Sequence, residues 1–117
     1  MIELAREFDA DEILIEDAGP GQHHITELKN GPYDFGTPII GLKPTGSKTD
    51  RMVGASGCIE SGQVFLPEEA PWLAAYLNEV LAFPRSRHDD QVDSTSQFLN
   101  WVRNRKVHTC SSQEFRI

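Results

Sequence analysis

The sequence predicts an α/β fold with a mixed, mostly parallel sheet flanked by helices. Short apolar runs of strand length alternate along the chain with segments of helical periodicity, and this alternation is typical of parallel sheets. Hydrophobic residues make up 38% of the chain, which is enough for an ordered core. A length of 117 residues leaves room for one domain only.

The first half of the chain contains two predicted helices and two predicted strands. Residues 1–10 place apolar side chains at loosely helical spacing, and residues 22–29 form a short helix with one apolar stripe. Residues 12–16 and 37–42 are short apolar runs rich in isoleucine. Both are predicted to be strands, and the first is typical of a buried strand in a mostly parallel sheet.

The second half contains three predicted helices and one predicted strand. Residues 48–59 follow a turn that could cap them, although two glycines weaken this helix. Residues 62–67 predict a third strand, at an edge or in a hairpin. Residues 71–81 form the clearest amphipathic helix, and residues 89–104 form the last one.

Domain organisation and class follow from the same pattern. Residues 1–104 are predicted to form the folded domain, and residues 105–117, which have little apolar pattern, are predicted to form a mobile tail. No apolar run approaches the roughly 20 residues of a membrane span, so we expect a soluble protein. Cys58 and Cys110 have no partners at zinc-site spacing and are expected to be reduced thiols.

The net charge of −7 restricts the kinds of partner that the chain can bind. Affinity for phosphate without sequence preference comes from lysine and arginine, so an acidic chain has little general attraction for nucleic acid. If DNA is the substrate, cations or another domain must supply that attraction.

Three aspartates gather at the start of the last predicted helix. Asp89, Asp90 and Asp93 repel one another on its first two turns, and a bound cation would balance them. Residues three or four apart share a helix face, so Asp93 can converge with either of the others, whereas adjacent residues diverge by roughly 100°. Only one of the adjacent pair is then expected to touch the primary metal ion. Capping and the helix dipole also favour acids at this position without any metal.

A second acidic position lies at the end of the first predicted strand. Glu16 closes that strand, and Asp17 follows it before a glycine-rich turn. In open α/β sheets, functional groups gather at the carboxyl ends of strands. Glu16 is therefore the best partner for the aspartates of the last helix, although an acid before such a turn is equally consistent with a turn former.

Four segments in fixed order resemble the C-terminal part of the nuclease domain of tailed-phage terminase large subunits. They span about residues 13–101, and they are residues 13–21, 46–51, 59–67 and 88–94. The resemblance implies a ribonuclease H-like fold and a metal-dependent DNA endonuclease that cleaves concatemeric DNA during packaging.

The resemblance also implies roles for the acidic residues. Glu16 corresponds to the second catalytic acid, with Asp17 as its substitute, and Asp89 or Asp90 corresponds to the third. Asp93 is implied as an accessory ligand, and Mg²⁺ or Mn²⁺ as the metal ion.

Basic residues near these motifs are candidates for binding the DNA backbone. The candidates are Lys48, Arg51, Arg85, Arg87 and His88. Exposed basic side chains are also commonly just solvated, and a histidine at such a position commonly caps or packs against the helix.

The sequence departs from the family pattern at its beginning. Family members carry a first catalytic aspartate on an earlier strand, and no such residue precedes Glu16, because Asp9 and Asp11 end a helix. We therefore expect a truncated or prophage-remnant domain that lacks the first strands. The alternative is a catalytically inactive remnant that binds DNA or protein. A third interpretation is a small interaction module whose acids are only helix caps.

The expected partners follow from the same resemblance. They are double-stranded DNA, other terminase or portal components, and a second copy paired through the exposed sheet edge. The expected location is the cytoplasm of the bacterial host cell.

Overall fold

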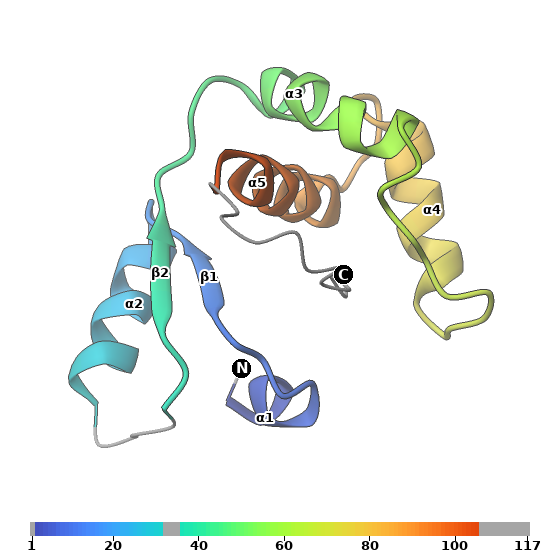
Figure 1. Cartoon of the computed structure of the whole chain (residues 1–117). Helices are drawn as coiled ribbons and strands as arrows, with labels where there is room; N and C mark the ends of the chain where they lie inside the picture. Colours follow the sequence, from blue (N-terminus) through green and yellow to red (C-terminus); the bar gives the residue numbers. More distant parts are fainter. Residues whose placement is uncertain (1, 32–35, 106–117) are drawn as a thin grey trace. The chain divides into compact units, whose positions relative to one another are not determined.

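The computed structural model describes residues 2–31 and 36–105 and divides the chain into two compact units (Figure 1). The first unit is Met1–Thr45 and the second is Gly46–Ile117. The predicted tail is residues 105–117, and residues 106–117 of it, with Cys110, lie outside the described residues. Cys58 is a free thiol, as predicted.

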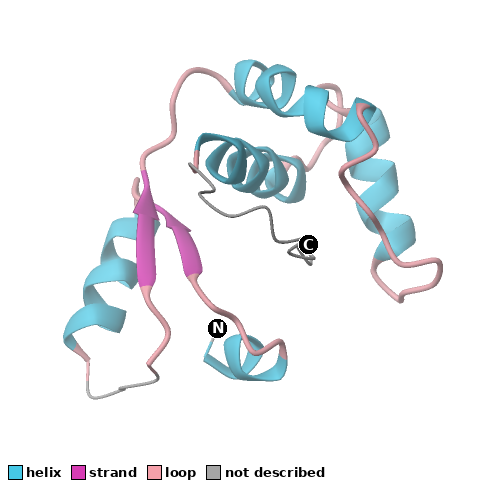
Figure 2. Ribbon diagram, viewed as in Figure 1, coloured by secondary structure: helices cyan, strands magenta, loops and turns pink. Residues whose placement is uncertain are grey.

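The first unit contains the strands of the fold. In chain order it consists of helix α1 (Ile2–Glu7), strand β1 (Ile13–Glu16), helix α2 (Pro20–Asn30) and strand β2 (Ile39–Leu42). The two strands are neighbours and run parallel (Figure 2). This arrangement confirms the predicted α/β character and the predicted parallel pairing.

The register of the two strands fixes where β1 ends. Ile13 lies opposite Ile39, and Glu16 lies opposite Leu42. The Asp17 backbone N–H donates to the Leu42 carbonyl at 2.7 Å, which extends the ladder by one residue. Ile15 is buried, and α2 packs against both strands. The carboxyl end of β1 is thus tied to its neighbour on one side.

The second unit is a set of three helices, α3 (Lys48–Glu60), α4 (Leu73–Ala82) and α5 (Asp90–Asn104). Both α3 and α4 pack against α5. Because α5 is enclosed on these sides, it supplies most of the buried residues. The core of the unit consists of Ala55, Tyr76, Val92, Ser96 and Leu99, with Thr95 and Asp93 also buried.

Helix α3 begins at a capping box, which agrees with the capping turn predicted before residue 48. The Ser47 hydroxyl accepts a hydrogen bond from the Asp50 N–H at 3.1 Å, and the Asp50 carboxylate accepts one from the Ser47 N–H at 3.2 Å. These hydrogen bonds, led by the one from the Ser47 backbone, lower the pKa of Asp50 below its ordinary value. The cap fixes the first turn of α3, which carries Lys48 and Arg51.

The predicted third strand is wrong. Residues 62–67 form the connection after α3 without strand structure, and β1 and β2 are the only strands among the described residues. Phe65 is 80% exposed, so its apolar side chain does not face a core. A strand needs a neighbouring strand whose backbone completes its hydrogen bonds. The composition of a short run does not ensure that such a neighbour is present.

Candidate functional site

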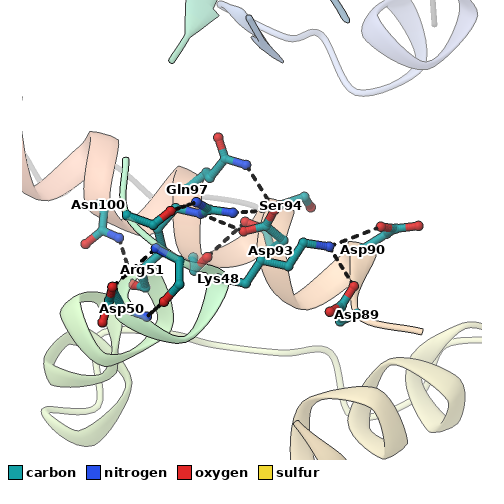
Figure 3. A network of polar contacts seen from close by, with 12 residues as sticks. Lys48, Asp50, Arg51, Asp89, Asp90, Asp93, Ser94, Gln97 and Asn100 are labelled. Carbon is teal, nitrogen blue, oxygen red and sulfur yellow. Dashed lines mark hydrogen bonds and ion pairs between the residues drawn. The ribbon is translucent and has the colours of Figure 1, made fainter. Parts of the chain in front are cut away.

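Helix α5 begins one residue later than its acidic run. Asp89 occupies the N-cap position with φ −136° and ψ 11°, and the helix itself starts at Asp90. Because Asp89 lies outside the helix, the expected divergence between adjacent helical residues does not apply to this pair. Lys48 Nζ lies 2.7 Å from Asp89 Oδ1 and 3.7 Å from Asp90 Oδ1 (Figure 3). Both carboxylates therefore reach the same cation.

The Asp89 and Asp90 carboxylates remain accessible in this arrangement. The Asp89 side chain is 34% exposed and the Asp90 side chain is 97% exposed. The hydrogen bond to Asp89, together with the negative charges of Asp89, Asp93 and Asp90, raises the pKa of Lys48 above its ordinary value against the opposing effect of burial. Lys48 thus stays protonated and screens the repulsion between the acids.

Asp93 has a different partner. Arg51 Nε lies 2.8 Å from Asp93 Oδ1, and Arg51 Nη2 lies 3.0 Å from Asp93 Oδ2 (Figure 3). The two side chains are only 10% and 8% exposed, so this is a nearly buried, bidentate ion pair. Asp93 faces Arg51, whereas Asp89 and Asp90 face Lys48. The metal role implied for Asp93 stays a prediction.

Arg51 makes further hydrogen bonds, one to the turn before α3 and one to α5. Its Nη1 donates to the Gly46 carbonyl at 2.9 Å, and its own carbonyl accepts from Asn100 Nδ2 at 2.9 Å. A β-carbon at Gly54 would lie 3.2 Å from Asn100 Oδ1, so the glycine permits the close approach of the two helices. The DNA contact expected of Arg51 stays a prediction.

Glu79, on α4, was not identified from the sequence. Its Oε1 accepts hydrogen bonds from the backbone N–H groups of Gln91 at 2.7 Å and Val92 at 3.1 Å, and its Oε2 accepts one from Gln91 Nε2 at 3.0 Å. An acid on an amphipathic helix looks like an ordinary solvent-facing residue. The only signal in the sequence is that its helix is the one that precedes the acidic run.

Glu16 and Asp17 belong to the first unit, at the carboxyl end of β1 as predicted. Glu16 is exposed and Asp17 is half-buried. The following turn brings the start of α2 onto the strand, and a β-carbon at Gly21 would overlap the Glu16 carbonyl oxygen. Glycine is therefore required at position 21 for this turn. That Glu16 shares a metal ion with Asp89 and Asp90 stays a prediction.

The other basic candidates lie in the connection between α4 and α5. Arg85, Arg87 and His88 are all exposed, as a contact to a DNA backbone would require. Their expected role in binding DNA stays a prediction.

The donor set suits a hard divalent cation. Carboxylate oxygens are the ligands that Mg²⁺ and Mn²⁺ prefer. The Lys48 ammonium marks a position that oxygens of both Asp89 and Asp90 reach, so these two residues fit one cation. Among residues 2–31 and 36–105, no three His, Cys, Asp or Glu side chains gather at one point. The described site is thus a pair of carboxylates.

The chain is similar to one known protein family. Residues 1–101 match the protein-family model described as a terminase RNaseH-like domain. No curated protein and no solved structure matched the chain. Within the part of the chain that the structure describes, no helix has the length and apolar character needed to cross a membrane.

Proposed function

The chain belongs to the terminase RNaseH-like domain family, and from this premise we propose that it is a metal-dependent DNA endonuclease domain of a phage terminase large subunit. Its substrate would be concatemeric double-stranded DNA, cleaved during packaging in the cytoplasm of the bacterial host. The observation that carries the proposal is the approach of Asp89 and Asp90 to one cation position at the head of α5.

In the proposed site, the residues of the chain bind the metal ion and the DNA backbone. Asp89 and Asp90 would hold Mg²⁺ or Mn²⁺ at the position that Lys48 Nζ marks, with Glu16 as a further carboxylate ligand and Asp17 as its substitute. When bound there, the ion would activate water and offset charge on the phosphate.

Lys48 would then exchange its contact with the acids for a contact with DNA. A divalent cation carries twice the charge of the ammonium group, so it would displace Lys48 from the two carboxylates. The displaced side chain could pair with a backbone phosphate, beside Arg85 and Arg87. These local cations would supply attraction that the net charge of −7 opposes.

The alternative is a catalytically inactive module that binds DNA or protein. Lys48 and Arg51 neutralise the acidic run from within the chain, which favours this alternative because the acids then need no metal for stability. Contacts with other terminase or portal components would fit either function. Pairing with a second copy through the edge of the β1–β2 sheet would also fit either.

A plasmid-nicking assay with Mn²⁺ tests the proposed activity. We expect the parent protein to nick supercoiled DNA, and we expect Glu16→Ala and the double variant Asp89→Ala/Asp90→Ala to lose at least about 100-fold in rate. Losing one preorganised electrostatic contact to a transition state typically has an effect of this size.

The matched control is Glu69→Ala, which removes an exposed carboxylate from the connection between α3 and α4. This variant should nick at the parental rate. Equal background nicking by the parent and all variants would rule out the endonuclease. A gel-shift measurement of DNA binding by the same proteins would then identify a DNA-binding module.

A further inference from the structure

The N-terminus of α5 is capped from another helix. The first N–H groups of a helix lack partners within it, and an aspartate at the N-cap is among the residues that usually satisfy them. Asp89 occupies the N-cap but makes no side-chain hydrogen bond to the helix. The Glu79 carboxylate accepts from the N–H groups of Gln91 and Val92 instead.

Because Glu79 caps the helix, the Asp89 carboxylate is available for another role. Its Oδ1 accepts a hydrogen bond from Lys48 at 2.7 Å, at the position that Asp90 also approaches. If Asp89 accepted from the Val92 N–H, as an ordinary N-cap residue does, its carboxylate would turn back over the helix end. It would then no longer face the cation position together with Asp90.

The attachment of α4 to α5 fixes the place of Glu79. One turn before Glu79, the Tyr76 hydroxyl lies 2.7 Å from the Thr95 hydroxyl, and both groups are buried. Residues three apart share a helix face, so Tyr76 and Glu79 both face α5. The buried hydrogen bond holds the helices together at the level from which Glu79 reaches the helix end.

We propose that Glu79 is a positioning residue for the nuclease site, because it caps α5 in place of Asp89 and thereby leaves Asp89 to bind a divalent cation with Asp90. This inference rests on the proposed function. Glu79 itself touches neither metal nor DNA in this role. It acts through the side-chain orientation of Asp89.

The rate of hydrogen exchange at the Val92 amide tests whether Glu79 caps this N–H group in place of Asp89. In the parent, Asp89→Ala should leave the exchange rate of this amide unchanged. In the Glu79→Ala background, Asp89 should take over the cap, so Asp89→Ala should then raise the rate about fivefold, the factor for a typical cap. An equal effect of Asp89→Ala in both backgrounds would overturn the proposal.

Mn²⁺ binding, measured with the metal ion alone, tests the positioning role. We expect Glu79→Ala to weaken binding about tenfold or more, as loss of a group that orients a ligand typically does. Asp89→Ala should add no further loss in that background. Glu79→Gln keeps an acceptor oxygen for the helix end and should restore most of the affinity.

The matched control is Asn78→Ala, which removes an exposed polar side chain next to Glu79 on α4 and should bind Mn²⁺ like the parent. Equal Mn²⁺ affinity of the parent and Glu79→Ala would overturn the positioning role alone. A parent that binds no Mn²⁺ would overturn the proposed function together with the positioning role.

Discussion

Asp93→Ala is expected to lower the free energy of unfolding by about 3–5 kcal/mol, the usual cost of removing one partner from a buried ion pair. Asp93 accepts two hydrogen bonds from Arg51, at 2.8 and 3.0 Å, and both side chains are nearly buried. Without the carboxylate, two guanidinium nitrogens lose their charged acceptor in a place where water cannot fully replace it. Urea denaturation measures the loss.

Two variants test whether the loss of stability is specific to the Arg51–Asp93 ion pair or follows from any substitution in the acidic run. The double variant Arg51→Met/Asp93→Leu replaces both charges by apolar groups, and it should recover most of the lost stability or exceed the parent. Asp90→Ala removes a carboxylate that is 97% exposed and should cost about 0–1 kcal/mol. If Asp93→Ala were as stable as the parent but failed to bind Mn²⁺, Asp93 would be a metal ligand and not a structural residue.

Gly21→Ala is expected to lower the free energy of unfolding by about 1–3 kcal/mol, the typical cost of forcing a methyl group into occupied space. The added β-carbon would overlap the Glu16 carbonyl oxygen. Because this oxygen belongs to the backbone, relief requires the end of β1 or the start of α2 to shift. Thermal or urea unfolding should show the loss, and the amide signal of Glu16 should move.

The same substitution at Gly57 is the matched control. Gly57 lies within α3, and a β-carbon there would meet no atom within 4 Å. Gly57→Ala should therefore stabilise the protein by about 0.5–1 kcal/mol, because alanine loses less backbone entropy in a helix. Equal destabilisation by both variants would contradict the steric explanation for Gly21.

The local pattern of the sequence predicted most helix and strand positions. The isoleucine-rich runs became β1 and β2, and the turn before α3 became its capping box. These elements were predictable because strand composition, capping residues and helix breakers act within a few residues of the structure that they specify. The family resemblance was confirmed by the match over residues 1–101.

The partners of the acidic run were not predictable from local pattern. Spacing within one helix suggested that Asp93 would converge with Asp89 or Asp90. In the structure, a lysine of α3 pairs with Asp89 and Asp90, whereas an arginine of α3 pairs with Asp93. Lys48 and Arg51 lie 41 and 42 residues before their partners in the chain. Glu79, in turn, reaches the head of α5 only because α4 packs there. Contacts of this kind depend on how helices pack and leave no periodic trace in the sequence.

Titration with Mn²⁺, followed through the backbone amide signals of Glu16, Asp89 and Asp90, is the decisive measurement for the proposed nuclease centre. If one bound cation is shared by these carboxylates, all three signals should broaden over the same range of Mn²⁺ concentration. Asp89→Ala/Asp90→Ala should then abolish the broadening at Glu16 as well. Broadening at Glu16 that persists in this double variant, or signals of the parent that stay sharp throughout, would contradict a shared metal site.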